Sequence, residues 1–554
     1  MQFITNGPDI PDSLLQAHEE GKVVFFCGAG ISYPAGLPGF GDLVDNIYQR
    51  IGETRNALEE AAYKSYQYDT TLELLERRIV GNKQTVRYAL SQILKPKVRR
   101  KNALTTHNAL LQLSQDQAGR IRLVTTNFDH LFDIAAKNMK KKLTSYLAPM
   151  LPVPKNSRWN GVVYLHGILP HDKKNHTELN RLVVTSGDFG CAYLTERWAA
   201  RFVSELFRNY VVCFIGYSIN DPVLRYMMDA LAADRMLGEY TPQAYAFADY
   251  KPNEESTTAE IWEAKGVIPV LYKTTKKHEL LHETLKIWGE IYNNGSMGKE
   301  RIVAQYVIAH PSTSTQEDNF VGRVLWALSD NSGKPAKRLA EMNPAPTLSW
   351  LWEFEKKSYR YPDLPRFNTP AHSEFDPNLQ FSLINRPSSY KLSPRMSLAS
   401  FGDEFCQWDS VMGYICLWLI KHIGNVDLII WLAKQGGKLH PQLSNLISNR
   451  LSEIERLERN NEEQSLKRIK QEGLHAIPSQ NLRAIWRLFL AGRIGTNTSV
   501  YENNYWIDQF LHGNFNMACR LALRKILAPT LILQQPFQLN FNKSSQNEKT
   551  FHNL

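Results

Sequence analysis

Residues 23–40, VVFFCGAGISYPAGLPGF, decide the expected fold of this chain. The apolar run at 23–27 is a candidate strand, and the small-residue turn Gly28-Ala29-Gly30 follows it directly. Glycine has no Cβ, so such a turn lets backbone amides approach a phosphate group closely. The stretch therefore predicts a strand that delivers a phosphate-binding loop, although residues 28–30 alone could also form a tight structural turn.

The composition predicts a globular protein with two or more domains. The 554 residues exceed what one hydrophobic core usually supports. Apolar residues make up 43% of the chain and charged residues 22%, which is ordinary for a soluble protein. No apolar run reaches the roughly 18–20 residues of a membrane span. Residues 1–22 contain prolines and acidic residues where a signal peptide needs a basic start and an apolar run. We therefore expect a cytoplasmic protein without a membrane partner.

The spacing of the cysteines bears on metal binding, and the distribution of charge bears on the partners that the chain could bind. The six cysteines contain no C-x-x-C pair, so a structural zinc site built from two such pairs is excluded. The net charge is +10, and basic clusters occur at residues 95–101 (KPKVRRK) and 137–142 (KNMKKK). These clusters fit either solvated helix ends or a surface for nucleic acid or a protein partner. Both interpretations stay open at this point.

From residue 12 to about 290, strand-like and helix-like segments alternate. The short, apolar and non-alternating candidate strands are typical of parallel strands buried on both faces. Residues 42–114 have helical periodicity and no good strand, so they predict a helical insertion after the first loop. The pattern indicates an α/β fold with a doubly wound, mostly parallel, Rossmann-like sheet. The candidate strands are residues 23–27, 121–125, 161–165, 182–185, 210–215, 244–248 and 267–272.

Beyond residues 293–298 (NNGSMG) the sequence pattern changes. Tryptophans recur without glycine-rich strand–turn–helix units, and residues 410–434 and 443–472 read as helices. Residues 359–395 predict an irregular segment, and the polar residues 540–554 a frayed tail. We expect one domain at 12–292 and a mainly α-helical domain at 300–540, whose tryptophans form a core rather than a binding platform.

Three further segments follow candidate strands. They are Thr125-Thr126-Asn127-Phe128-Asp129, Tyr164-Leu165-His166-Gly167, and Phe214-Ile215-Gly216-Tyr217-Ser218 with Asp221-Pro222 after it. In an open α/β sheet, ligands bind outside the carboxyl ends of the strands. Together with the first loop, these segments are therefore expected to line one crevice.

This set resembles the sirtuin family, the silent-information-regulator deacylases and their relatives. The family's hallmarks are a G-A-G-x-S-x-x-x-G-[IL]-P loop, a T-x-N-x-D segment, an H-G pair and a later G-[TY]-S segment, all present here in that order. The resemblance covers residues 12–290 and implies a domain that binds NAD and cleaves its nicotinamide–ribose bond. NAD would be the substrate.

The resemblance implies roles for individual residues. Asn127 would hydrogen-bond a ribose hydroxyl or hold a water, and His166, with an ordinary pKa near ~6.5, would act as a general base. Asp129 would orient Asn127 or the loop. Asn127 and Asp129 could also cap the following helix. The residues expected to bind NAD are Gly28, Ala29, Gly30, Ser32, Pro38 and Thr126, with Ala29, Gly30 and Ser32 at the pyrophosphate, and Gly216, Tyr217 and Ser218, with Gly216 and Ser218 on the adenosine side.

The chain departs from the deacylase pattern at several positions, and these departures indicate which branch of the family it resembles. Deacylases continue the first loop as P-D-F-R, whereas this chain has Pro38-Gly39-Phe40-Gly41, and it lacks their zinc module of paired cysteines. The segment GYSINDP at 216–222 matches the form found in bacterial sirtuin-like proteins of anti-phage defence. That likeness implies an NAD+ glycohydrolase that depletes NAD in abortive infection, releasing nicotinamide and ADP-ribose. The alternatives are a catalytically silent NAD or ADP-ribose sensor and a zinc-less NAD-dependent lysine deacylase.

The resemblance also implies that the chain assembles with copies of itself or with a partner protein. Relatives of this kind form large homo-oligomers, and some work with a hexameric translocase-type ATPase. The helical domain would then serve regulation or oligomerisation, in response to a phage-derived trigger that the sequence does not identify.

One further motif has a competing interpretation. Residues 278–282, HELLH, match the H-E-x-x-H pattern of zinc proteases. The motif begins an amphipathic helix, and no third ligand follows at the metzincin spacing. We expect a packing helix and no metal site.

Overall fold

The computed structural model describes most of the N-terminal part of the chain and parts of the C-terminal half. Two compact units form, one of residues 1–299 with 314–323 and the other of residues 300–313 with 324–554. The described residues are 1–80, 82–116, 118–155, 158–171, 176–219, 221, 224, 226–228, 241–330, 332–355, 384–385, 410–434, 438–439, 441–460, 463–464, 467 and 478–490.

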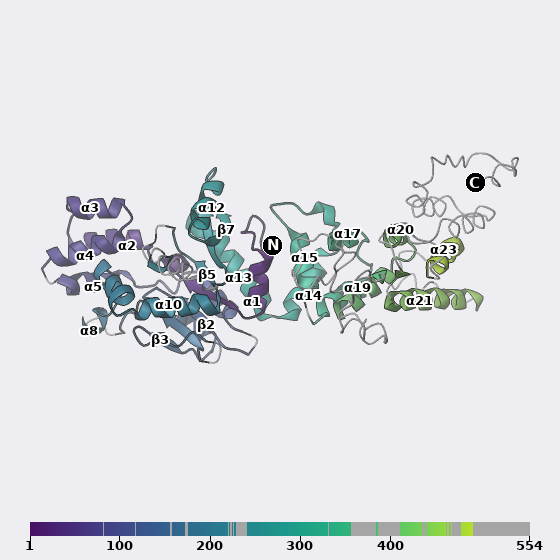
Figure 1. The fold of residues 1–554 in the computed structure, drawn as a ribbon, viewed down its shortest axis with the longest axis horizontal. Helices are drawn as coiled ribbons and strands as arrows, with labels where there is room; N and C mark the ends of the chain where they lie inside the picture. The colour runs from purple at the N-terminus through teal and green to yellow at the C-terminus, as the bar shows by residue number, and fades with distance from the viewer. Residues whose placement is uncertain are drawn as a thin grey trace, which may run out of the picture. The chain divides into compact units, whose positions relative to one another are not determined.

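The first unit is built on a seven-stranded, entirely parallel sheet (Figure 1). The chain starts in the middle at β1, adds strands on one side and then crosses to the other side at β5, so a topological switch lies between β1 and β5. In spatial order the strands are β3 (Ser145–Leu147), β4 (Gly161–Tyr164), β2 (Arg122–Thr125), β1 (Val23–Cys27), β5 (Val211–Ile215), β6 (Ala244–Tyr250) and β7 (Val267–Lys273).

Helices cover both faces of this sheet because its central strands are apolar on both. Phe26 of β1 belongs to a core shared with α10 (Trp198–Asn209) and α12 (Glu255–Glu263). Phe25, on the opposite face, packs against His18 of α1 (Asp12–Glu19) and Trp288 of α13 (Glu279–Asn293). Helix α6 (Thr105–Leu113) packs against α13. The doubly wound α/β fold predicted from the sequence is confirmed.

Most of the predicted helical insertion, residues 42–114, forms a group of its own, but α6 at its end packs on α13 instead. Figure 1 shows its four helices beside the sheet. They share a core that contains Val44, Leu72, Leu75 and Leu90, so the insertion does not depend on sheet contacts alone. The helices are α2 (Phe40–Ile51), α3 (Ala57–Lys64), α4 (Tyr68–Arg78) and α5 (Asn82–Ile93). The short helix α8 (His176–Leu179) contacts α5, and η1 (Ala29–Ala35), a 3-10 helix, connects β1 to Gly36.

Two local predictions differ from the structure. Residues 182–185 were expected to form a strand but are irregular, and they lead into α9 (Ser186–Phe189) with Thr185 as its N-cap. Leu182 and Val184 are apolar because they pack on the helical insertion, not because they join the sheet. Conversely, β3 at the sheet edge is half-exposed and short, so its sequence lacks the apolar run by which the other strands were found.

The described part of the second unit is mainly helical. Trp350, Trp418 and Trp486 are fully buried, and each indole N–H donates to a backbone carbonyl, as expected of a core. Most of residues 359–395 and all of 540–554 lie outside the described residues, as does most of the predicted helix beyond Arg459. The described α-helices that lie entirely within this unit are α16 (Lys334–Glu341), α17 (Trp350–Glu355), α19 (Ser410–Ile420), α20 (Val426–Lys434), α21 (Pro441–Arg459) and α23 (Gln480–Leu490), and β8 (Ile384–Asn385) pairs with β9 (Lys438–Leu439).

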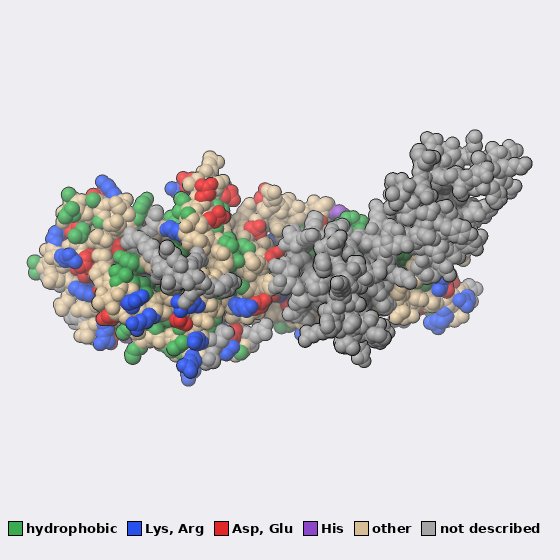
Figure 2. All heavy atoms as spheres, viewed as in Figure 1, with side chains coloured by type: hydrophobic (Ala, Val, Ile, Leu, Met, Phe, Trp, Pro, Cys, Tyr) green, Lys and Arg blue, Asp and Glu red, His purple; other side chains and the backbone are tan. Residues whose placement is uncertain are grey.

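Three further α-helices belong to the first unit or to the segments between the units. Helix α7 (Leu131–Asn138) follows β2, and α14 (Ser296–Tyr306) and α15 (Phe320–Leu328) lie where the chain passes between the two units. Among the described residues, no helix has the length and apolarity to cross a bilayer. On the face of the first unit shown in Figure 2, basic and acidic side chains are interspersed.

Candidate active site

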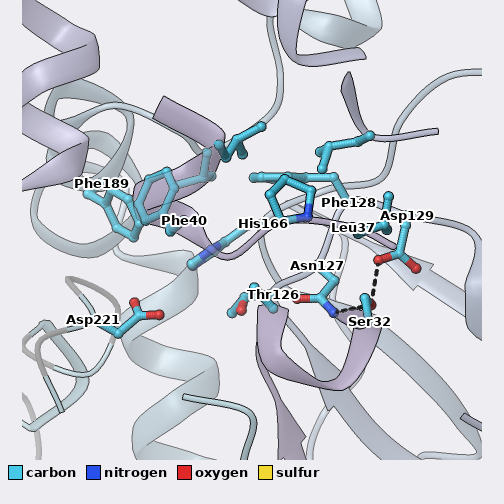
Figure 3. A pocket seen from close by; sticks show the side chains of 15 residues that line it. Ser32, Leu37, Phe40, Thr126, Asn127, Phe128, Asp129, His166, Phe189 and Asp221 are labelled. Atoms are coloured by element: carbon cyan, nitrogen blue, oxygen red, sulfur yellow. Dashed lines mark hydrogen bonds between the residues drawn. The ribbon is translucent and has the colours of Figure 1, made fainter. Parts of the chain in front are cut away.

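A pocket opens at the carboxyl edge of the sheet, where the loops after β1, β2 and β4 meet. About 600 Å³ of space lies among its lining residues, counted together with the open solvent at its mouth. Seven of the residues predicted from the sequence line it: Ala29, Ser32, Pro38, Thr126, Asn127, Asp129 and His166. Figure 3 shows the polar members facing the same space. Segments separated by more than a hundred residues therefore meet in one site.

The other five predicted residues, Gly28, Gly30, Gly216, Tyr217 and Ser218, are not among the residues that line this pocket. The Gly30 N–H donates to the Gly216 carbonyl at 2.9 Å, and the Gly28 N–H donates to Ile215 at 2.8 Å. A Cβ on Gly30 would lie 2.9 Å from Gly216 Cα, a contact that real side chains do not make. These glycines let the β1 and β5 loops touch, and the Gly30 amide is occupied. Their role toward NAD remains a prediction.

Tyr217 and Thr126 form a second link between loops. The Tyr217 hydroxyl lies 2.7 Å from the Thr126 hydroxyl and is buried. The Thr126 N–H also donates to the Cys27 carbonyl at the end of β1. The three loops after β1, β2 and β5 are thereby held at fixed distances, which preorganises the floor of the pocket.

Asn127 is oriented by a buried polar network. Its Nδ2 donates to the Gly28 carbonyl at 3.1 Å and to Ser32 Oγ at 3.3 Å, so both of its N–H groups are used. Ser32 Oγ in turn donates to Asp129 Oδ2 at 3.0 Å. The carbonyl oxygen of Asn127 consequently points away from Ser32, into the pocket (Figure 3). A fixed acceptor oxygen is what this network supplies to a ligand.

Asp129 contacts both the first loop and the start of the following helix. Oδ2 accepts from Ser32, and Oδ1 accepts from the Leu131 N–H in the first turn of α7. Burial raises the pKa of this carboxyl, while these two hydrogen bonds and the neighbouring His130 oppose the rise. Asp129 therefore fixes the start of α7 and the position of Ser32 at the same time.

The sequence prediction missed His107. This histidine of α6 is fully buried, and its Nε2 lies 3.4 Å from Ser32 Oγ. The single hydroxyl hydrogen of Ser32 goes to Asp129, so the His107 Nε2–H must be the donor and Nδ1 must be unprotonated. Burial lowers the pKa of His107 to about 3. No motif marks this residue, because it lies on a helix face 75 positions after Ser32 in the chain.

His166 is buried against aromatic side chains. Only 2% of it is exposed, its Nε2 lies 3.1 Å from the Tyr193 hydroxyl, and its ring meets that of Phe189 edge-on at 5.0 Å. Burial lowers the pKa of His166 to about 3, against a small opposing effect of Asp188. The pKa of His166 thus lies well below the ordinary value near ~6.5, and the imidazole is neutral at physiological pH.

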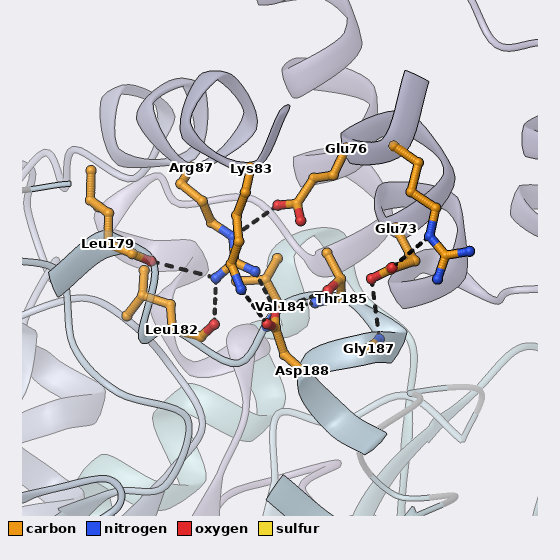
Figure 4. A network of polar contacts seen from close by, with 11 residues as sticks. Glu73, Glu76, Lys83, Arg87, Leu179, Leu182, Val184, Thr185, Gly187 and Asp188 are labelled. Carbon is orange, nitrogen blue, oxygen red and sulfur yellow. Dashed lines mark hydrogen bonds and ion pairs between the residues drawn. The ribbon is translucent and has the colours of Figure 1, made fainter. Parts of the chain in front are cut away.

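The rest of the wall is apolar and is held by a buried ion-pair network (Figure 4). Arg87 of α5 is fully buried and pairs with Glu76 and Asp188. Asp188 also accepts from the Val184 and Thr185 N–H groups. The Val183 N–H donates to the His166 carbonyl at 3.0 Å. The network thus ties the helical insertion to the segment beside His166. The apolar lining residues are Leu37, Phe40, Leu43, Leu94, Phe128, Val183 and Phe189.

The HELLH histidines are used in side-chain contacts. His278 stacks on Tyr33, with ring centroids 5.7 Å apart, and its Nδ1 lies 3.0 Å from the Tyr272 hydroxyl. His282 Nδ1 lies 2.9 Å from the Thr106 hydroxyl of α6. Over the part of the chain that the structure describes, no group of three or more His, Cys, Asp or Glu residues could hold a metal. Asp221 lines the pocket, and Pro222 lies outside the described residues.

Comparison with known proteins bears on the domain that holds this pocket. Residues 121–270 match the model of the SIR2-like domain, a range that runs from β2 to β7 and contains Asn127, His166 and Gly216. The chain is also 34% identical over 329 residues to the uncharacterized protein y4cA of Sinorhizobium fredii. That alignment covers 58% of this chain and 27% of the relative, so the chain spans about a quarter of the relative's length. The SIR2-like match supports the predicted sirtuin-like character of the N-terminal unit and indicates an NAD-related function.

Proposed function

We propose that the chain is an NAD+ glycohydrolase, which cleaves the nicotinamide–ribose bond and releases nicotinamide and ADP-ribose. The observation that carries the proposal is the fixed orientation of Asn127, whose carbonyl oxygen shares one pocket with His166. The SIR2-like match over residues 121–270 agrees with NAD as the substrate.

The charges around the pocket suit a cationic leaving group. The described lining residues include Asp129 and Asp221 but no lysine or arginine. The nicotinamide ring of NAD+ is positively charged, and cleavage moves positive charge onto the ribose as the ring departs with the bonding electron pair. Acidic groups placed where positive charge develops lower the barrier to this step.

Asn127 would position the attacking water. Its fixed acceptor oxygen can hold a water or a ribose hydroxyl beside the anomeric carbon, at no cost of reorientation during the reaction. The water oxygen forms the new bond to the ribose carbon. The reaction balances as NAD+ and water giving nicotinamide, ADP-ribose and one proton.

His166 would accept a hydrogen bond or the released proton. Because burial lowers its pKa to about 3, the imidazole is already in the neutral form that a base requires. Such a weak base would accept the proton late in the reaction. By then the ribose carbon is strongly electrophilic, and the water that bonds to it has become more acidic. The edge-on Phe189 ring excludes bulk water from one side of the imidazole.

The proposal is tested by nicotinamide release from the full chain. Asn127→Ala and His166→Ala are each expected to lower kcat by about 100-fold or more, in the range of losses from single catalytic groups. Asn138→Ala, an exposed asparagine at the far end of α7, and His18→Ala, a buried histidine outside the pocket lining, are the matched controls. Unchanged turnover in both pocket variants would overturn the assignment.

The alternatives predict other products. A sensor would bind NAD or ADP-ribose in calorimetry with no nicotinamide released under any condition of assembly. A zinc-less deacylase would release nicotinamide only in the presence of an acylated peptide, with the acyl group transferred to ADP-ribose.

We further propose the biological setting that the sequence resemblance implies. The chain would act in the bacterial cytoplasm as an NAD-depleting effector of abortive infection against phage. The mainly helical unit would serve regulation or homo-oligomerisation, with a hexameric translocase-type ATPase as a possible partner. Mass measurement of the purified chain, alone and with that ATPase, tests the assembly.

A further inference from the structure

An exposed basic loop follows α5. Residues 95–101, KPKVRRK, contain five cations, Lys95, Lys97, Arg99, Arg100 and Lys101, and all five are solvent-exposed. No ion pair to any of them forms among the described residues, whereas Arg77, Arg78, Lys83 and Arg87 of the preceding helices are all paired. The loop therefore carries positive charge that no acidic side chain in the described part of the chain neutralises through an ion pair.

The loop is fixed to the rim of the pocket. The Lys97 N–H donates to the Ala35 carbonyl of η1 at 2.7 Å. A Cβ on Gly36 would lie 2.7 Å from Arg100 Nη1, so this arginine lies directly against the glycine. Leu94, the residue before the loop, lines the pocket, as does Leu37 after Gly36. The cations are thus held beside the pocket wall by backbone contacts.

The second basic cluster lies elsewhere. Residues 137–142 begin in the last turn of helix α7, which runs back from the carboxyl end of β2, and continue past its end at Asn138. Lys141 Nζ bonds to Gln115 shortly before β2 begins. Of the two clusters in the sequence, only residues 95–101 adjoin the pocket. The cluster at 137–142 is at the opposite, amino edge of the sheet, and it offers a control of similar charge.

The chemistry of the loop favours phosphates over a protein partner. Stable protein interfaces are centred on buried aromatic or large apolar anchors. Val98 is the one large apolar residue of the loop that is exposed, and residues 95–101 contain no aromatic. Lysine and arginine without such anchors are typical of contacts to a nucleic-acid backbone, which are driven by release of counterions.

We propose that residues 95–101 form a nucleic-acid-binding surface at the rim of the pocket, which contacts the phosphate backbone without reading base sequence. This surface does not depend on NAD hydrolysis. Of the two interpretations that the sequence leaves open for residues 95–101, the proposal selects the nucleic-acid surface.

The test is binding of a fluorescent single-stranded DNA of about 20 nucleotides to the full chain, measured by anisotropy at several salt concentrations. Substituting alanine for all five cations is expected to weaken binding at least tenfold at low salt. Loss of five phosphate contacts predicts that the magnitude of the slope of log affinity against log salt falls by about 3.5, at about 0.7 per contact on a single strand. Alanine substitution of Lys137, Lys140, Lys141 and Lys142 is the matched control and is expected to change affinity less than twofold.

Either of two results would overturn the proposal. One is equal loss of DNA binding in the two sets of variants, because binding would then follow net charge alone. The other is unchanged DNA binding in the 95–101 variant, whatever else changes. If that variant also loses binding to poly-glutamate, the loop is instead a docking site for an acidic protein segment. Both variants leave the polar residues of the pocket intact, so nicotinamide release reports separately on the proposed hydrolysis.

Discussion

The low pKa of His166 makes a quantitative prediction about pH. Burial lowers this pKa from 6.5 to about 3, and the difference corresponds to roughly 5 kcal/mol against placing a proton on the imidazole in the folded state. A base must be unprotonated to act, so the active form of His166 is present at every pH above about 4. Between pH 8 and pH 5, kcat/KM for nicotinamide release is therefore expected to stay within about twofold.

An ordinary histidine would behave differently. With a pKa of 6.5, only about 3% of His166 would be neutral at pH 5, and activity would fall about 30-fold. The substitution Phe189→Ala distinguishes a pKa near 3 from a pKa near 6.5, because it removes the ring packed edge-on against the imidazole. Water admitted there raises the pKa of His166 toward 6.5, so this variant is expected to lose activity below pH 6.5 while the wild type does not.

The assay needs two controls. Phe207→Ala removes another fully buried phenylalanine of the same core without touching His166, and it is expected to keep the flat profile. Stability also changes with pH, since a histidine with a lowered folded pKa stabilises the fold above pH 6.5 and loses that contribution as the pH falls. At pH 5 each such histidine costs about 2 kcal/mol, so circular dichroism must show that the protein remains folded. A wild-type acid limb near pH 6.5 in the folded protein would refute the reasoning.

Two further substitutions test the supporting structure. Ser32→Ala removes the acceptor that orients Asn127, so kcat is expected to fall about tenfold to 100-fold in the nicotinamide assay with KM changed much less. Asp188→Asn removes a charge partner of the fully buried Arg87, which is expected to lower the unfolding free energy in urea by about 3–5 kcal/mol. The matched change Glu73→Gln, at a partly exposed site, is expected to cost less than about 1 kcal/mol.

The strands of the first unit were predictable where burial alone determines the sequence. In β1, β4 and β5 the chain is apolar because both faces of the sheet are covered, and a short uninterrupted apolar run is typical of such a strand. At residues 182–185, however, a short apolar run does not form a strand. There Leu182 and Val184 pack on the helical insertion while Asp188 holds the backbone in a loop, and the sequence contains no sign that a buried arginine 95 residues earlier bonds to Leu182.

The chemistry of the candidate site was predictable by residue type but not by environment. Motifs identify Asn127 and His166 because their positions relative to strand ends are local properties of the chain. The pKa of His166 depends on Phe189 and Tyr193, and the orientation of Asn127 depends on Ser32 and Asp129, all brought together by the fold.

The glycines of the first loop show the same distinction most clearly. Glycine has no Cβ, so another group can come close to its backbone, but the sequence does not show which group this is. For Gly30 the approaching group is Gly216, whose carbonyl accepts its N–H and whose Cα would be 2.9 Å from any added Cβ. The glycine pattern is therefore needed to build the contact between the β1 and β5 loops even before a nucleotide binds. It follows that loss of activity on substituting Gly30 would not distinguish phosphate binding from loop packing, whereas Asn127 and His166 can be changed without altering that contact.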